Sequence, residues 1–285
     1  MSSSSATSVP SSLTSPPVKA TVEPDNCQFT DVFEKVPLLE NVPVSKTSFI
    51  ARFGLPDASK SLGLSTCACI LAGVEIDGEM VVRPYTPIST NADVGTFDLL
   101  VKKYPDGKMS SFLSDLKPSD EKVVAFKHIS FNVKTQYPFN SPKVVVMLAG
   151  GTGITPMIQA LHAILGDEEG TIEKTHLIYG SRNQDDILGK EMLDKWADEN
   201  SDKLSVTHVL SNEEAEISGD GFKKGFIDRK LIESIVPPPS AGSDVLIFVC
   251  GPPIMYDVLC GDRTEAGVTG LLGDIGYSSD QVYKF

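Results

Sequence analysis

The rhythm of apolar runs changes near Lys143, and this change constrains the fold more than any other feature of the sequence. After this point short apolar strands alternate with helical segments. Strands that alternate with helices form a parallel sheet covered on both faces. The expected strands are 144–149, 176–179, 204–210 and 245–249, and the expected helices are 157–165, 189–199, 229–235 and 254–259. The second half of the chain is therefore predicted to be a doubly wound α/β domain.

The first half of the chain has a different pattern. Short β-prone runs, expected at 48–53, 67–72, 79–83 and 96–102, are separated by turn residues such as Asp77-Gly78 and Asp106-Gly107. Closely spaced strands joined by tight turns favour an antiparallel barrel. One helix is expected within it, because Phe112, Leu113 and Leu116 share a helical face.

The first 27 residues are rich in Ser, Thr and Pro and contain few apolar residues. Such a segment buries too little surface to offset its chain entropy, so a disordered tail is predicted. It has no apolar signal core and no arginine, and a transit peptide remains an alternative. The predicted organisation is a tail over 1–27, a barrel domain over 28–138 and an α/β domain over 139–285.

Composition excludes several classes of function. The formal net charge of -13 disfavours nucleic acid as a partner. No apolar run reaches the ~20 residues needed to cross a bilayer, which predicts a soluble or peripheral protein. The 5 cysteines are odd in number and lack ligand spacing, so neither disulfides nor a metal site is expected. The cytoplasm is the predicted compartment, with membrane association or mitochondria as alternatives.

The segment from Arg83 to Thr86 carries the first candidate site. Arg83 and Tyr85 are two apart and share a face if the segment is a strand, while Pro84 removes a ladder donor. An arginine offers paired donors to a phosphate, and a tyrosine ring can stack on a flavin. The Thr86 hydroxyl can bond the ring system. The alternative is an ordinary edge strand.

The run Gly107-Lys108-Met109-Ser110 opens the expected helix of the barrel domain. Backbone N–H groups at a helix N-terminus attract pyrophosphate, and Ser110 can serve as a cap or a donor. A simple hairpin turn is the alternative reading.

Two loops of the second domain form a second candidate site. The loop Gly150 to Thr155 lies between a strand and a helix, with Thr155 expected as the N-cap and Pro156 as the first helical residue. It matches neither the P-loop nor the dinucleotide fingerprint. Cys250 ends another strand at the same predicted edge, where open α/β sheets bind ligands. A structural turn and a packed thiol are the alternatives. The four histidines are scattered, so hydrolysis is not indicated.

With these motifs and their spacing, the chain resembles the NADH-cytochrome b5 reductase family of ferredoxin-NADP reductase-like flavoproteins. The resemblance runs from about Asp31 to Phe285 and includes Leu62-Gly63-Leu64 and 98–102. It implies a β + α/β fold: a six-stranded antiparallel FAD-binding barrel followed by a doubly wound pyridine-nucleotide-binding domain.

The resemblance also implies roles for individual residues. Thr86, near the reactive edge of the flavin, and Cys250, beside the nicotinamide, would tune the geometry of hydride transfer. FAD would be held by Arg83, Pro84, Tyr85, Thr86, Leu100, Lys102, Gly107, Lys108, Met109 and Ser110. The pyridine nucleotide would be held by Gly151, Thr152, Gly153, Thr155, Pro156, Met157, Cys250, Gly251, Pro252 and Met255.

The implied activity is hydride transfer from NADH to FAD, followed by single-electron transfer to cytochrome b5 or a related haem protein. NADPH is the alternative donor, because Ser211 stands where an acidic partner for the adenosine ribose is sought. Quinone, ferric chelate or ferredoxin are alternative acceptors, and a non-catalytic nucleotide-binding subunit is the alternative class. Eight lysines against four acids between Leu100 and Val145 would suit an acidic partner or a solvated surface.

Overall fold

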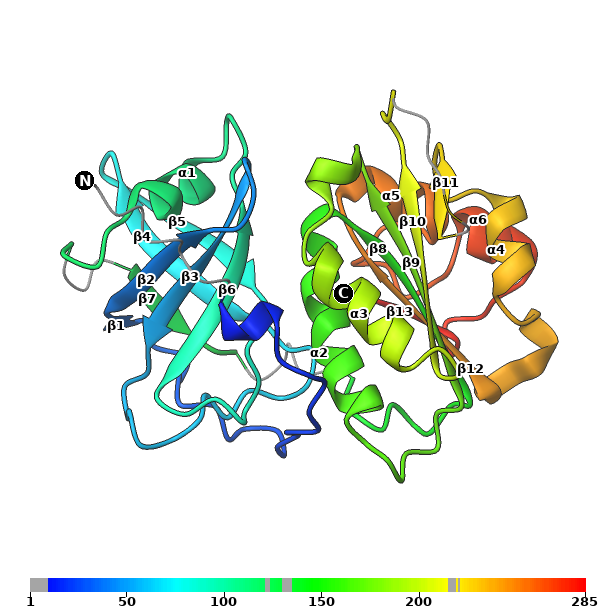
Figure 1. Ribbon diagram of the computed structural model, residues 1–285, viewed down its shortest axis with the longest axis horizontal. Helices are drawn as coiled ribbons and strands as arrows, with labels where there is room; N and C mark the ends of the chain where they lie inside the picture. The colour runs from blue at the N-terminus through cyan, green and yellow to red at the C-terminus, as the bar shows by residue number, and fades with distance from the viewer. Residues whose placement is uncertain (1–9, 121–123, 130–134, 215–218, 220) are drawn as a thin grey trace, which may run out of the picture. The chain divides into compact units, whose positions relative to one another are not determined.

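The computed structural model describes residues 10–120, 124–129, 135–214, 219 and 221–285 (Figure 1). The chain divides into two compact units, Met1–Lys134 and Thr135–Phe285. This division lies close to the border predicted at Pro138. Among the described residues, no helix combines the length and the apolar character that crossing a membrane requires.

The first unit contains two antiparallel sheets. One has the strand order β1-β7-β4-β5 and the other the order β2-β3-β6. The strands are β1 (Glu34–Val36), β2 (Leu38–Pro43), β3 (Ser48–Gly54), β4 (Ile70–Ile76), β5 (Glu79–Tyr85), β6 (Thr96–Lys102) and β7 (Val124–Lys127). The helices are the 3-10 helix η1 (Ser11–Leu13) and α1 (Lys108–Asp115). The predicted antiparallel architecture is confirmed.

The strand count differs from the predicted six, because one β segment changes sheet. β1 and β2 are separated only by Pro37, and they belong to different sheets. A proline has no N–H for the ladder, so pairing is interrupted where the chain turns from one sheet to the other. If β1 and β2 are counted as one bent strand, the described part of this unit has the six strands that were predicted.

Residues of alternate strand positions build the core of this unit. On β6, Phe97, Leu99 and Val101 face the core, while Asp98 and Leu100 lie on the other face. The rings of Phe29, Phe53, Phe97 and Phe126 pack with centroids 4.9–5.7 Å apart. α1 joins this core through the buried Leu113.

Two local expectations in this unit are wrong. The strand predicted from residue 67 begins at Ile70, because Cys67 has a φ of 63° and lies in a turn that the Ala68 N–H closes on the Ser65 carbonyl. The predicted disorder of 1–27 is also wrong for the described residues from Pro10 onward, while residues 1–9 lie outside the described part of the chain. Ser11–Leu13 form η1, in which Ser12 and Leu13 are buried.

The second unit is built on a six-stranded parallel sheet with the order β11-β10-β9-β8-β12-β13. The strands are β8 (Val144–Gly150), β9 (Lys174–Ser181), β10 (Leu204–Leu210), β11 (Phe222–Lys224), β12 (Val245–Cys250) and β13 (Val282–Lys284). The α-helices are α2 (Ile154–Leu165), α3 (Lys190–Glu199), α4 (Arg229–Ile235), α5 (Pro253–Leu259) and α6 (Gly270–Ile275). The 3-10 helices are η3 (Gly151–Gly153), η4 (Gln184–Asp186) and η5 (Pro239–Asp244).

Helices cover both faces of this sheet. Ile232 of α4, Tyr256 of α5 and Leu272 of α6 share one core cluster with β8 and β12. α2 and α3 lie along the opposite face (Figure 1). The doubly wound α/β prediction is confirmed, and the C-terminal ends of β8 and β12 lie side by side at one edge.

Candidate functional site

β5 carries the first motif at the end of the four-stranded sheet. Pro84 is tolerated there because an edge strand can do without one ladder donor. Arg83 is exposed, and its Nη1 donates to the carbonyl oxygen of Val82 at 2.7 Å. Within the described part of the chain the Arg83 guanidinium forms no ion pair. Most of its donors are therefore available to a ligand.

Tyr85 stands two residues further along the same strand. Its ring is half-buried and packs against the core of the first unit. Burial raises the pKa of Tyr85 to about 12, against the opposing effect of the Arg83 charge. The phenol is therefore neutral, and β5 presents an aromatic ring next to a guanidinium.

The N-terminus of α1 lies against β5. The Nζ of Lys108, the first residue of α1, is 3.1 Å from Glu79 Oε2 at the start of β5. Gly107 is the N-cap, and no side chain caps the helix. A Cβ at position 107 would lie 2.3 Å from Ser110 Oγ, so a larger residue there would displace the Ser110 hydroxyl from its bonds in this turn. Uncapped N–H groups of a helix that packs against the strand carrying Arg83 suit a diphosphate, as FAD requires.

Met109 and Ser110 have structural roles in this turn. Met109 is buried in the core. The Ser110 hydroxyl accepts from the Tyr104 N–H at 3.2 Å and donates to the Gly107 carbonyl at 3.2 Å. These two residues shape the entrance to α1, whether or not they also contact a ligand.

Leu100 and Lys102 lie on β6, at the end of the three-stranded sheet rather than beside β5. Leu100 is buried and Lys102 half-buried. Packing of α1 on β5 therefore brings the residues of these two elements together, while Leu100 and Lys102 belong to the other sheet.

Asp98 joins β6 to the segment that follows the first motif. Its carbonyl accepts from the Ile88 N–H at 2.9 Å, and its own N–H donates to Ser89 Oγ at 2.9 Å. The carboxylate is 2% exposed, and Arg52 contacts both of its oxygens at 2.8 Å. Ser12 Oγ donates to Asp98 Oδ2 at 2.6 Å.

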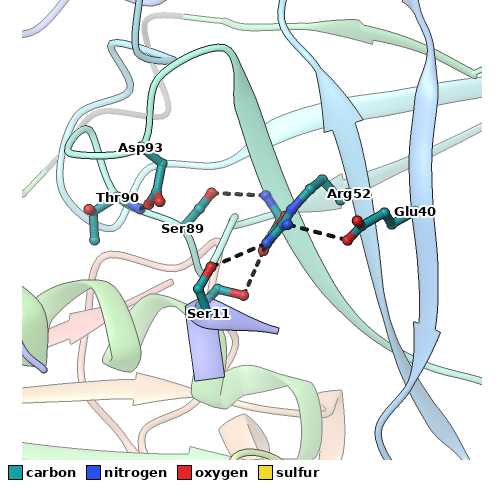
Figure 2. Close-up of polar contacts among 8 residues, drawn as sticks. Ser11, Glu40, Arg52, Ser89, Thr90 and Asp93 are labelled. Carbon is teal, nitrogen blue, oxygen red and sulfur yellow. Dashed lines mark hydrogen bonds and ion pairs between the residues drawn. The ribbon is translucent and has the colours of Figure 1, made fainter. Parts of the chain in front are cut away.

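Figure 2 shows this polar cluster, in which Arg52 also reaches Glu40 at 3.3 Å and Ser11 Oγ at 3.4 Å. Sequence reasoning missed the cluster. A signal existed, because Arg52 and Asp98 each interrupt an apolar run, but their partnership follows from the register of β3 with β6.

The second motif pair lies at the C-terminal edge of the parallel sheet. Cys250 at the end of β12 is in register with Ala149 of β8. A Cβ on Gly153 would lie 2.1 Å from the Cys250 carbonyl oxygen. Cβ atoms on Gly150 and Gly251 would lie 2.6 Å and 2.4 Å from Met255 Sδ. The structure therefore brings Gly151–Gly153 together with Cys250, Gly251, Pro252 and Met255.

The start of α2 differs from the prediction. The helix begins at Ile154 with Gly153 as its N-cap, so Thr155 is not the cap. The Thr155 hydroxyl donates instead to the Thr152 carbonyl at 3.2 Å. Pro156 lies in the first turn, where helical N–H groups have no intrahelical partner. Met157 is buried in the core.

Tyr179 is a residue of this edge that sequence reasoning missed. Its hydroxyl donates to the Gly151 carbonyl at 2.9 Å and accepts from the Leu188 N–H at 3.3 Å. Gly151 has a φ of 54°, so Tyr179 holds a left-handed turn of the loop. Only the pairing of β9 with β8 reveals this role. Among the described residues, no group of three His, Cys, Asp or Glu side chains could hold a metal ion.

Two family models match the two units of the chain. An oxidoreductase FAD-binding domain model matches residues 35–128, and an oxidoreductase NAD-binding domain model matches residues 147–261. The first range contains α1, and the second contains Gly150, Gly151, Gly153 and Gly251. The fold and these matches define a flavin- and pyridine-nucleotide-binding oxidoreductase.

Relatives narrow the family. NADH-cytochrome b5 reductase 2 of Meyerozyma guilliermondii is 39% identical over 238 residues, which cover 82% of this chain and 78% of the relative. NADH-cytochrome b5 reductase 1 of Candida albicans is 37% identical over 262 residues, covering 90% and 83%. The chain belongs to the NADH-cytochrome b5 reductase family.

Solved structures support the fold. The cytochrome b5 reductase domain of Ulva prolifera nitrate reductase has a TM-score of 0.73 at 24% identity, covering 93% of this chain and 99% of that one. A ferredoxin NADP+ reductase from Neisseria gonorrhoeae has a TM-score of 0.65 at 15% identity, covering 89% and 98%. Which residues contact each cofactor stays a prediction.

Proposed function

We propose that the chain oxidises NADH through bound FAD and passes electrons singly to cytochrome b5 or a similar one-electron acceptor. The observation that best supports this proposal is the 39% identity to a relative named NADH-cytochrome b5 reductase 2, which extends across most of both chains. FAD supplies the chemistry of accepting a hydride and releasing electrons one at a time, while the protein supplies position and electrostatics.

Different residues of the first unit bind different parts of FAD. Arg83 and the N-terminal amides of α1 bind the diphosphate, which needs fixed donors. Tyr85 offers a neutral ring for stacking, and Thr86, which directly follows β5, offers a hydroxyl to the ring edge. The main chain of Asp98 holds Ile88 and Ser89 after Thr86 in place, and Arg52 in turn binds the Asp98 carboxylate.

The residues of the second unit hold NADH. The glycines of η3 and the Cys250 loop allow the backbone to approach the nucleotide closely at the C-terminal edge of the sheet. Cys250 is half-buried at the end of β12 and orients the nicotinamide without forming a covalent bond.

The test uses the purified protein and its own colour. A protein that carries FAD absorbs in the visible, and anaerobic NADH should bleach this absorbance within the mixing time of a manual experiment. Cytochrome b5 is then added, and its reduction is followed against quinone, ferric chelate and ferredoxin. A colourless protein that takes up no FAD contradicts the proposal, whereas bleaching without cytochrome b5 reduction redirects it to another acceptor.

For the electron donor we propose NADH before NADPH. Ser211 follows β10 where a ribose partner is expected, and its N–H donates to the Ser181 carbonyl at 3.0 Å. Glu213, two residues on, accepts from the Gln184 N–H at 2.9 Å, which brings a carboxylate to this edge. A 2′-phosphate would meet that negative charge. Equal kcat/KM for NADH and NADPH would refute the preference.

The lysine-rich stretch between Leu100 and Val145 gives only limited support for electrostatic steering of an acidic acceptor, because several of its lysines form ion pairs. Lys103, Lys108 and Lys143 pair with Asp115, Glu79 and Asp244 at 2.8–3.1 Å. Exposed pairs of this kind neutralise much of the local field. We therefore propose a weak dependence of cytochrome b5 reduction on ionic strength.

For the compartment we propose the cytoplasm, because the odd cysteine count favours a reducing environment. Cell fractionation tests this, and recovery in membranes or mitochondria would contradict it.

A further inference from the structure

Tyr256 carries a buried hydroxyl next to the loop that ends β12. It lies on α5, six positions after Cys250, and is 4% exposed. Its Oη donates to the main-chain oxygen of Phe285 at 2.7 Å. The ring alone would serve the core cluster that it shares with Leu259 and Leu272. A buried hydroxyl is costly unless it is hydrogen-bonded, so its partners indicate what it does.

Phe285 lies beside the strand that leads to Cys250. β13 pairs with β12 so that Lys284 is in register with Val249. The Phe285 N–H extends this ladder by donating to the Val249 carbonyl at 3.1 Å. The ring of Phe285 packs edge-on against Phe248 at 5.4 Å. The acceptor of the Tyr256 hydroxyl is therefore fixed next to the end of β12.

The same hydroxyl meets the loop itself. The Cys250 side chain and the Gly251 N–H lie close enough to the Tyr256 hydroxyl to act on its pKa in opposite directions. Burial, followed by Cys250, raises the pKa of Tyr256, so the phenol keeps its proton. The Tyr256 hydroxyl thus joins α5 to the segment after β13, and it does so beside the Cys250–Gly251 loop.

We propose that Tyr256 is a positioning residue that fixes the Cys250 side chain and the Gly251 backbone for the nicotinamide. This inference rests on the proposed function, because it assigns Cys250 to the pyridine-nucleotide site. The physical reason is that reacting groups held in one geometry react faster than groups that sample several. Tyr256 acts through Cys250 and does not itself contact the nucleotide.

Tyr256→Phe removes only the hydroxyl, and Tyr277→Phe is its matched control. Tyr277 is also 4% exposed, belongs to the same core cluster and donates to the Pro237 carbonyl at 2.7 Å, away from the loop. In the FAD-loaded protein, stopped-flow absorbance should show flavin reduction at saturating NADH slowed about fivefold by Tyr256→Phe. The dissociation constant for NADH should change less than twofold. Tyr277→Phe should retain the wild-type rate.

A double-mutant cycle separates positioning from general stability. If Tyr256 works through Cys250, adding Tyr256→Phe to Cys250→Ala should slow flavin reduction no further. Equal slowing in both backgrounds would overturn the proposal, and so would a wild-type rate in Tyr256→Phe.

Amide hydrogen exchange tests the same geometry without catalysis. Pro252 and Pro253 have no N–H, so peptides over this loop report Gly251 clearly. Its exchange should be about fivefold faster in Tyr256→Phe and unchanged in Tyr277→Phe. Unchanged exchange overturns the positioning role. A wild-type protein that NADH does not reduce would instead remove the proposed function, and the exchange result would still decide whether Tyr256 fixes the loop.

Discussion

At the residue scale, the nucleotide loops of the second unit are determined by contacts between them. Gly153 faces the Cys250 carbonyl so closely that no larger side chain fits without movement. The glycines of this edge thus serve packing of one loop on another as well as access for a ligand. Substitution at this position should therefore affect stability and nucleotide binding together.

Gly153→Ala should destabilise the second unit by about 1–3 kcal/mol, because the new methyl group displaces the Cys250 loop. Denaturant unfolding followed by the fluorescence of Trp196, the only tryptophan, measures this. Gly267→Ala is the control, since a Cβ there has nothing within 4 Å, and should stay within about 0.5 kcal/mol. Equal stability of the two variants would show that the loop accommodates the methyl group.

Arg83→Ala should lower the affinity for FAD about 10- to 100-fold, because it removes charge-assisted hydrogen bonds to the diphosphate. The flavin-to-protein absorbance ratio after dialysis measures the loss. Arg83→Lys keeps the charge without the planar fork and should give an intermediate ratio. Undiminished flavin in Arg83→Ala would remove Arg83 from the site.

The sequence predicted both motifs but missed the side chains that support them. Arg83, Tyr85, Gly151 and Cys250 could be proposed from the sequence because motif spacing is local, and their roles stay predictions. Asp98, Tyr179 and Tyr256 could not, because each acts through a residue far away in the chain. The N-cap at Thr155 was wrong for a related reason: the tight packing of η3 on the Cys250 loop places the start of α2 earlier.

At the element scale, long apolar elements were predictable and short ones were not. The predicted strand 204–210 and helix 229–235 coincide with β10 and α4. β1, β11 and β13 have three residues each, too few to show a period of two. These strands exist because a longer neighbour pairs with them.

The segment around η1 contacts the barrel through the hydrogen bond from Ser12 to Asp98, the contact of Ser11 with Arg52 and the buried Leu13. Ser12→Ala should weaken its docking by about 1 kcal/mol, because it removes the donor to buried Asp98. Trypsin should then cleave after Lys19 about fivefold faster. Thr14→Ala, an exposed change in the same segment, should leave the rate unchanged. An unaltered rate in Ser12→Ala would show that apolar contacts of Leu13 suffice for docking.

At the scale of the whole molecule, acid should weaken the second unit through the buried His162. Burial lowers the pKa of His162 from 6.5 to about 4. The unfolded chain binds this proton as the pH falls below 6.5 while the folded chain does not, so stability is complete above pH 6.5 and declines towards pH 4. The loss attributable to His162 reaches about 3 kcal/mol.

Denaturant unfolding at several pH values between 4 and 7, followed by Trp196 fluorescence, measures this decline. The rings of His162 and Trp196 pack 4.7 Å apart, so the probe lies beside the titrating group. His162→Phe keeps an aromatic ring without a proton site and should flatten the pH dependence. A slope identical to that of the wild type would assign the acid sensitivity to other groups.

Ser12 and Asp98 also bear on how the protein should be prepared. A shorter version for crystallisation would naturally begin at Gln28, the start of the predicted barrel domain. The cut would strip a carboxylate of one of its donors and uncover the outer surface of β6. The truncated protein would be less stable than the full chain, and the loss would be greatest near the residues that follow Thr86.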